Sequence, residues 1–280
     1  MERRAHKSRW VRLPPGTAID ARTVDGWEFP VGTRFWKEFA FDGRKVETRL
    51  LWRSSAAGWT FASYRWDEAQ TDAELVPAAG AAHLVEVARG RRHSIPSVDD
   101  CRACHDSART ELLGFTALQL STDRDPLAPH AEPLAPGMVT LRTLVDERLL
   151  EPARPELVAV PPRIPAPDAR TRAVLGYLST NCGSCHNEES TIANLGLLLK
   201  APLVPSPEAV QRLFRPTAKW QIPRAPDGAS AFVTPGVPDL SALLVRMRSR
   251  RPSSHMPPLG TVLHDEAAIA LVDGWIRELR

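Results

Sequence analysis

The sequence predicts an α+β fold, with an N-terminal antiparallel β domain followed by a mostly helical remainder. Apolar and polar residues alternate in the first part of the chain, which also holds six of the eight tryptophans. Such alternation is typical of half-buried strands. Beyond Cys101 the apolar residues recur at helical spacing instead. The 26 prolines of the chain predict that the helices are short, because proline removes a backbone donor.

Three alternating segments are expected to form the β domain, at residues 33–41, 45–52 and 59–66. The dipeptide Asp42-Gly43 predicts a tight hairpin turn between the first two segments, and residues 54–58 predict a second turn. We expect the aromatic side chains of these segments mainly to fill the core.

The remainder of the chain is expected to hold short helices. Helical patterns occur at residues 112–120, 140–150, 168–180, 239–250 and 265–279, and Asp168 is placed to cap the third of them. Residues 151–168 contain six prolines, which predicts a stiff linker. Residues 202–238 are expected to be irregular.

All four cysteines belong to two Cys-x-x-Cys-His motifs, Cys101–His105 and Cys182–His186. In such a motif the two thiols lie one helical turn apart and bond the vinyl groups of one haem, and the histidine binds the iron. The sequence therefore predicts two covalent c-type haems. We expect Cys101, Cys104, Cys182 and Cys185 to attach them, and His105 and His186 to be iron ligands.

Three other uses of the cysteines are open. A zinc site built from both pairs is disfavoured, because the pairs are separated by far more than the roughly 15–20 residues of a zinc ribbon. A thioredoxin-like dithiol would need a βαβ context, which the sequence does not predict. Disulfides within the motifs would leave both histidines without a role.

Met256 is the candidate sixth ligand of the second haem. It lies between His255 and the pair Pro257-Pro258, shortly before the last predicted helix. A thioether ligand raises the reduction potential by favouring Fe(II), and the prolines would hold the loop. His255 is the neighbouring competitor, and we expect it to be a solvated residue.

The sixth ligand of the first haem is left open. The candidates are His93, His83, His130, Met138 and Met247. Met247 lies on the apolar stripe of its predicted helix, which favours a core position. An open iron is a further alternative, and it would permit ligand binding or peroxide chemistry.

Residues 168–280 resemble a class I cytochrome c module. The predicted helix 168–180 leads into the second motif, and the Met256 loop lies just before the terminal helix. The resemblance implies a cytochrome c-like helical fold, in which that first helix crosses the terminal one at Val272, Trp275 and Ile276. The chain departs from the module at residues 196–238, which resemble an insertion.

The whole chain resembles a family of bacterial di-haem c-type cytochromes. The segments that carry the resemblance are residues 10–17, 29–33, 64–73, 95–97 and 114–120, together with the two haem motifs. The resemblance spans nearly the full chain and implies the haem content and the fold. Pro14-Pro15-Gly16 usually follows further N-terminal sequence in that family, so we expect a longer natural start.

Composition narrows the functions considered. The formal net charge is only +3, from 36 basic and 33 acidic residues, which argues against a nucleic-acid partner but permits an acidic redox partner. No apolar run reaches the roughly 18 residues of a membrane span. Haem attachment to such motifs implies a periplasmic or cell-surface location. No apolar segment follows the basic start, so we expect the export signal to lie upstream.

These observations together predict three regions. Residues 1–92 form a β-rich N-terminal domain, residues 93–167 the first haem-binding region with its proline-rich linker, and residues 168–280 a cytochrome c-like second haem domain. The predicted function is electron relay between redox donor and acceptor proteins. The alternatives are a di-haem peroxidase-like enzyme with one five-coordinate haem, and a surface assembly that uses the β domain for docking. The sequence does not predict the oligomeric state.

Overall fold

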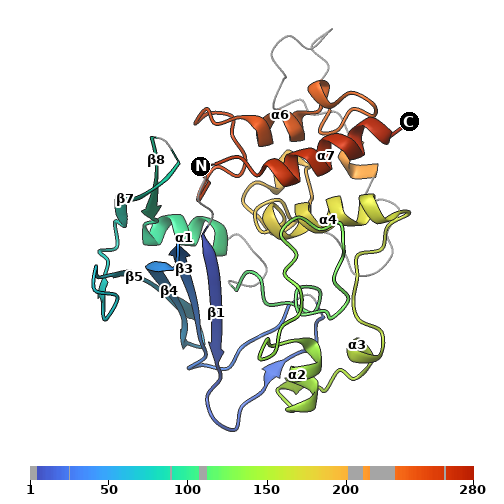
Figure 1. Cartoon of the computed structure of the whole chain (residues 1–280). Coiled ribbons are helices and arrows are strands. Elements are labelled where there is room, and N and C mark those ends of the chain that lie inside the picture. The colour runs from blue at the N-terminus through green and yellow to red at the C-terminus, as the bar shows by residue number, and fades with distance from the viewer. Residues whose placement is uncertain are drawn as a thin grey trace. The chain divides into compact units, whose positions relative to one another are not determined.

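The computed structural model describes residues 5–24, 26–88, 90–106, 112–200, 211–214, 231–261 and 263–280 (Figure 1). The chain divides into two compact units. Unit 1 comprises Met1–Asp106, Thr110–Leu112 and Leu144–Arg154, and unit 2 comprises Ser107–Arg109, Leu113–Thr143 and Pro155–Arg280. The three sequence regions stay a prediction, and each unit is described by itself below.

Unit 1 is built on a five-stranded antiparallel sheet with the strand order β1-β3-β4-β5-β6. Its strands are β1 (His6–Arg12), β3 (Arg34–Phe41), β4 (Arg44–Ser55), β5 (Gly58–Trp66) and β6 (Ala73–Leu75). The three strands predicted from alternation are confirmed. Asp42 and Gly43 both have positive φ, 50° and 78°, as expected for the hairpin turn between β3 and β4.

Four further strands complete unit 1. The strands β7 (Ala81–Ala88) and β8 (Arg91–Ile95) form an antiparallel hairpin. The short strand β2 (Ile19–Asp20) pairs in parallel with β9 (Leu150–Glu151). Arg154 donates from Nε to the carbonyl of Ala21 over 2.9 Å. These contacts fasten the start of the predicted linker to the N-terminal part of the chain.

One face of the five-stranded sheet carries the core of unit 1. Phe35 and Trp59 are buried, and both contact Phe29, with ring centroids 5.1 Å and 6.1 Å from its ring. Helix α1 (Val98–His105) packs against β5 (Figure 1). The first Cys-x-x-Cys-His motif thus lies on a helix that packs against the sheet.

Unit 2 contains most of the helices. They are α3 (Glu156–Ala159), α4 (Ala169–Asn181), α6 (Ala242–Arg248) and α7 (Glu266–Glu278), with short 3₁₀ turns at η1 (Ala193–Leu195), η2 (Arg212–Phe214) and η4 (Pro238–Leu240). Helix α2 (Leu141–Asp146) spans the boundary between the units. Asp168 caps α4 as predicted, because its Oδ1 accepts from the Thr171 backbone amide over 2.8 Å.

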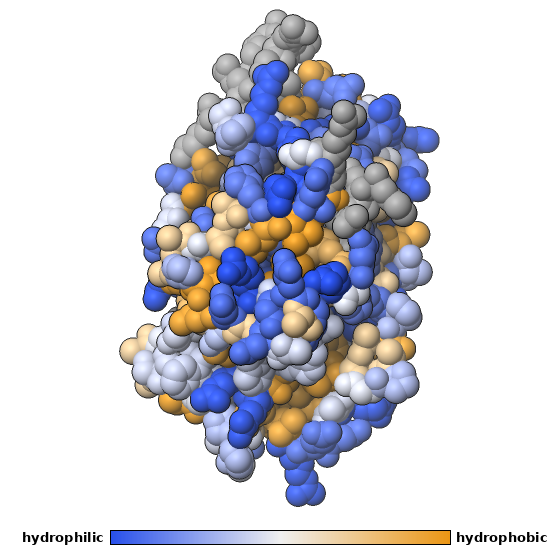
Figure 2. All heavy atoms as spheres, turned by 60° about the vertical axis from the view of Figure 1, so that its left-hand side comes forward, coloured by the Kyte–Doolittle hydropathy of each residue, from blue (hydrophilic) through white to orange (hydrophobic). Residues whose placement is uncertain are grey.

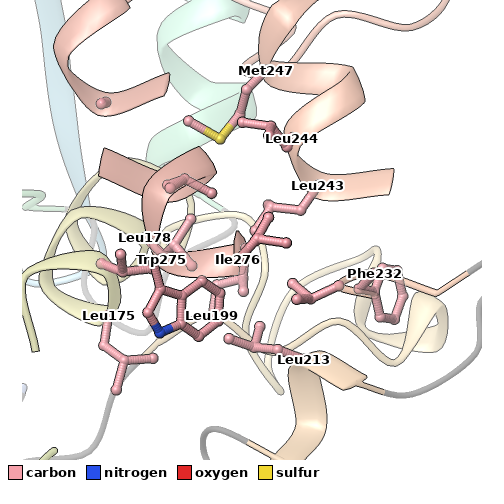
Figure 3. Close-up of a cluster of buried hydrophobic side chains, with 14 of the residues drawn as sticks. Leu175, Leu178, Leu199, Leu213, Phe232, Leu243, Leu244, Met247, Trp275 and Ile276 are labelled. Carbon is pink, nitrogen blue, oxygen red and sulfur yellow. The ribbon is translucent and has the colours of Figure 1, made fainter. Parts of the chain in front are cut away.

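Helices α4, α6 and α7 enclose the core of unit 2 (Figure 3). Leu178, Leu244 and Ile276, one from each helix, are almost fully buried. The indole of Trp275 donates to Thr171 Oγ1 over 3.1 Å, which joins α7 to α4. Met247 also lies in this core, as its position on the apolar stripe predicted.

The expected mostly helical, cytochrome c-like fold is wrong. Among the described residues, only α4 and α7 reach thirteen residues, and the other helices are shorter. Residues 112–120, predicted as a helix, form turns, and the pattern at 140–150 yields only α2. Gly114, with φ 90°, interrupts the first stretch, and Arg148, with φ 57°, interrupts the second, so part of the apolar side chains there is buried by irregular chain. The predicted antiparallel β domain is present, and the α+β class is correct only in part.

The described residues contain no helix that is long and apolar enough to cross a membrane. The face of the molecule drawn in Figure 2 shows hydrophobic residues between hydrophilic ones. Several large hydrophobic side chains are exposed, among them Trp10, Leu75 and Val160, and exposed apolar residues are common on protein surfaces.

Candidate functional site

The first Cys-x-x-Cys-His motif occupies the last turns of α1. Ser97 caps the helix in a capping box with Asp100: Ser97 Oγ accepts from the Asp100 amide over 3.0 Å, and the Asp100 carboxylate accepts from the Ser97 amide over 3.0 Å. Cys101, Cys104 and His105 are three and four residues apart, so they share one face of the helix. All three are half-buried.

The sheet supplies the surroundings of this motif. The His105 ring lies 5.0 Å from the Phe61 ring on β5, in an edge-to-face arrangement, and the Arg102 guanidinium lies over the same ring. The pKa of the Cys101 thiol is raised, mainly by burial. The positive charge of Arg49 opposes this rise, and the negative charges of Glu47 and Asp100 add to it. The thiol therefore lies within electrostatic reach of charged residues on β4.

A buried carboxylate on β4 is the main charged feature of this region. Glu47 has no exposed surface, and it interacts with His93 Nε2 over 2.9 Å and with the Arg49 guanidinium, whose Nη2 donates over 3.1 Å. Burial by itself would raise the pKa of Glu47. The hydrogen bonds of His93 and Arg49 outweigh burial and hold that pKa below its ordinary value.

The pairing of His93 with Glu47 limits how His93 could bind the iron of the first haem. Its Nε2 faces Glu47, so in this arrangement only Nδ1 would be available to bind an iron. The His93 ring is also held between Phe41 and Phe39, with ring centroids at 5.3 Å and 5.9 Å. His93 and His83 share unit 1 with the first motif, whereas the candidates His130, Met138 and Met247 belong to unit 2.

The second motif begins where α4 ends. Cys182 is the C-cap of α4, and its carbonyl accepts from the amides of Cys185 over 3.1 Å and of His186 over 2.8 Å. The motif therefore continues for one helical turn, which brings both thiols and the imidazole together. The amide of Leu199 donates to the His186 carbonyl over 2.8 Å, and this bond holds the motif against the following segment.

Gly183 is needed for this close packing. A Cβ atom at this position would come within 2.5 Å of the Ser179 carbonyl oxygen and 3.1 Å of the Lys200 Cα. Both neighbours are backbone atoms and cannot move aside cheaply. A glycine between the two cysteines thus lets the segment at Lys200 pass close to the motif.

Burial controls the protonation of the second motif. It raises the pKa of the Cys182 thiol to about 12, and the neighbouring Cys185 adds to this effect. Burial lowers the pKa of His186, the Leu197 backbone partly opposes this, and the charge of Arg246 lowers the pKa further. His186 Nδ1 is buried without a hydrogen-bond partner among the residues described. A neutral imidazole is the form that binds a metal ion, so His186 suits the role of an iron ligand.

Arg246 connects the Met256 loop with His186. The Arg246 carbonyl accepts from the Met256 amide over 3.1 Å, its Nε donates to the Ser254 carbonyl over 3.1 Å, and its charge acts on His186. The Met256 backbone is thus hydrogen-bonded to a residue whose charge acts on His186. Both ring nitrogens of His255 lie 3.0 Å from backbone carbonyls, those of Arg251 and Pro258, which leaves Met256 as the better ligand candidate.

A polar group lies at the start of α7, within electrostatic reach of Cys182. Asp265, the N-cap of α7, accepts from the Tyr177 hydroxyl over 3.3 Å and pairs with His130 Nε2 over 2.8 Å. Burial raises the pKa of Tyr177, and the charges of Asp265 and Cys182 raise it further. His130 is therefore engaged with α7 within unit 2.

The remaining sequence candidates have other surroundings. Met138 is 36% exposed, and its sulfur accepts from the Ala135 amide at 3.4 Å. Met247 lies in the unit 2 core. None of the four cysteines forms a disulfide bond. In the part of the chain that the structure describes, no three His, Cys, Asp or Glu side chains are grouped to hold a metal ion.

Sequence reasoning missed the charged neighbours of both motifs. Glu47 and Arg49 lie far from Cys101 in sequence, and only strand register brings them near it. One signal was present for Glu47: by strand alternation it shares a face of β4 with Leu51, which lies opposite Phe35 and Phe61, and a carboxylate is unusual on such an apolar face. Arg246 and Asp265 had no comparable signal, because charged residues are common at the ends of helices.

A scan against protein-family models and searches of curated proteins and of solved structures found no match to this chain.

Proposed function

We propose that this chain is an electron-transfer protein carrying two covalent c-type haems, one on each Cys-x-x-Cys-His motif. The observation that carries the proposal is the arrangement of the two motifs. Each has two cysteines that form no disulfide and a histidine on one helical turn, and together they account for every cysteine of the chain.

The chain's own residues would have distinct roles towards these haems. The four thiols would form the thioether bonds, and His105 and His186 would each offer a ring nitrogen to an iron. Met256, fastened through Arg246, would offer a soft thioether that favours the reduced state. A bound haem supplies reversible one-electron exchange. The Phe61 ring beside His105 and the buried setting of His186 would limit water around the ligands.

A second candidate function rests on the buried pair Glu47 and His93. A di-haem peroxidase-like enzyme needs one five-coordinate haem and a group that can move a proton beside it. Glu47 with His93 and Arg49 is such a group, and its charges reach Cys101 of the first motif. A ferric high-spin signal from one haem, together with turnover of hydrogen peroxide, would favour this function over relay.

The proposed setting is the periplasm or the cell surface, because haem is attached to such motifs outside the cytoplasm. The partners would be a redox donor protein and a redox acceptor protein. A surface assembly that uses the β domain as a docking module is the non-redox alternative, and binding of a partner that is independent of haem reduction would support it.

The test is haem attachment to each motif separately. The chain should be produced with a c-type haem maturation system, and its haem content measured as the pyridine haemochrome. We expect two haems per chain, and one haem in each double variant, Cys101→Ala with Cys104→Ala or Cys182→Ala with Cys185→Ala. Unchanged haem content in either double variant, or bound zinc in place of haem, would overturn the proposal.

A further inference from the structure

A row of cationic residues crosses the sheet of unit 1. Arg9 on β1 lies opposite Lys37 on β3, and Lys37 lies opposite Arg49 on β4. Residues directly opposite each other on antiparallel strands share a face and lie close together. Three positive side chains are therefore adjacent on the face that α1 covers. Like charges in this arrangement destabilise a sheet, so a negatively charged group beside the row would stabilise it.

Lys37 lies at the centre of this row without such a partner. Among the described residues it makes no hydrogen bond or ion pair, and its ammonium lies over the Phe39 ring, 5.1 Å from the centroid. Burial and the charges of Lys7, Arg9 and Arg49 lower its pKa to about 7, and only Glu47 opposes them. Glu47 itself is paired with Arg49 and His93.

The cationic row borders the first motif. The next row on the same face is apolar, with Phe35, Leu51 and Phe61 opposite one another on β3, β4 and β5. His105 contacts Phe61, and Cys101 lies within electrostatic reach of Arg49. The motif thus lies over β4 and β5, and Lys37 and Arg9 continue the same face towards β3 and β1.

We propose that Lys37, with Arg9 and Arg49 beside it, binds the propionate carboxylates of the haem attached to Cys101 and Cys104. The proposal rests on the proposed function of that motif. A c-type haem is joined to the protein through its vinyl groups, and its two propionates leave from the other side of the ring. The apolar row would contact the porphyrin, and the cationic row would neutralise its two negative charges.

The experiment measures the reduction potentials of the two haems in the matured chain. Lys37→Met removes a positive charge near one iron and so favours its ferric state. The potential of one haem should fall, while the other should stay unchanged. The haem that responds should be the one that Met256→Ala leaves unchanged, because Met256 belongs to the second motif. Lys37→Arg, which keeps the charge, should largely restore the potential.

Lys45→Met is the matched control. The Lys45 ammonium lies over the Trp66 ring, 3.3 Å from its centroid, and the Trp66 indole donates to the Thr48 hydroxyl. Thr48 is next to Glu47 on β4 and therefore lies on the opposite face of the sheet. Lys45 is thus a positive charge on the face away from the first motif. Two haems with unchanged potentials in Lys37→Met, or an equal fall in Lys45→Met, would overturn the proposal.

A second variant tests the proposal if the Lys37→Met chain fails to fold or to take up haem. Arg9 is exposed on the edge strand β1, so Arg9→Gln should fold and should lower the same potential by a smaller amount. An unchanged potential in that variant would overturn the propionate site. A chain that carries no haem on the first motif would overturn the proposed function as well.

Discussion

Glu47→Gln tests whether the buried charge group of unit 1 is correctly described. The substitution keeps the shape of the side chain and removes its negative charge. His93 and the Arg49 guanidinium then lose the acceptor that compensates them, within a setting where Glu47 has no exposed surface. We therefore expect unit 1 to be destabilised, although the strand order should be unchanged.

The magnitude follows from the burial of the partners. Removing one member of a fully buried ion pair costs about 3–5 kcal/mol. Here the Arg49 side chain is 26% exposed and the His93 side chain 15% exposed, so both regain some hydration in the variant. Hydrogen bonds to charged groups contribute about 1.5–3 kcal/mol. We expect a loss of about 2 kcal/mol in the free energy of unfolding.

The loss of folding stability in Glu47→Gln should become smaller as the pH falls. The pKa of Glu47 is lower in the folded chain than its ordinary value, because of its hydrogen bonds with His93 and Arg49. Its contribution to stability is then present above the unfolded pKa, about 4.3, and is lost as the pH falls through the folded pKa. The difference between the natural chain and the variant should therefore narrow in acid.

Denaturation followed by tryptophan fluorescence measures this effect, because six tryptophans lie in the N-terminal part of the chain. Glu74→Gln is the control: its partner Arg65 lies on the same sheet, and the two side chains are 77% and 51% exposed. Such a pair contributes less than about 1 kcal/mol. Equal losses in the two variants, or a loss in Glu47→Gln that grows in acid, would refute the reasoning.

Two further predictions concern unit 2. Met256→Ala should lower the potential of one haem and remove the weak absorption band of ferric methionine ligation; an unchanged spectrum would make His255 the next residue to test. Met247→Leu, its control, should cost under about 1.5 kcal/mol as a core substitution of similar volume and leave both haem spectra alone. Gly183→Ala should reduce haem attachment to the second motif, measured as haem content, because its Cβ would lie 2.5 Å from the Ser179 carbonyl oxygen; full attachment would contradict this packing argument.

Local patterns predicted the β part of the fold well. The hairpin at Asp42-Gly43 combines alternation with a dipeptide that tolerates positive φ, and both signals act over a few residues. The predicted cap of α4 is equally local, since Asp168 accepts from the Thr171 amide three residues ahead. The pairing of β2 with β9 escaped prediction because it joins Ile19 to Leu150, with no signal in either two-residue strand.

Helical periodicity predicted too much helix in the second half of the chain. Leu112 and Leu120 are both buried, so the apolar spacing correctly identified core residues there. It misidentified the backbone, because short irregular segments can also bury residues at such spacing. The resemblance to a class I cytochrome c module added to the error by implying that the remaining chain was helical.

The two Cys-x-x-Cys-His motifs are visible in the sequence, but their surroundings could not be predicted from it. Two thiols and a histidine at fixed spacing need only one helical turn. The neighbours that set their charge, such as Glu47 for Cys101 and Arg246 for His186, depend on strand register and helix packing, which no short sequence pattern encodes.

The most direct test of the central claim is the mass of the matured chain under denaturing conditions. Thioether bonds survive unfolding, so the polypeptide should retain the mass of two haems, and proteolysis should yield one haem on the peptide with Cys101 and Cys104 and one on the peptide with Cys182 and Cys185. A chain that releases its haem on denaturation, or that carries haem on neither peptide, would contradict the account.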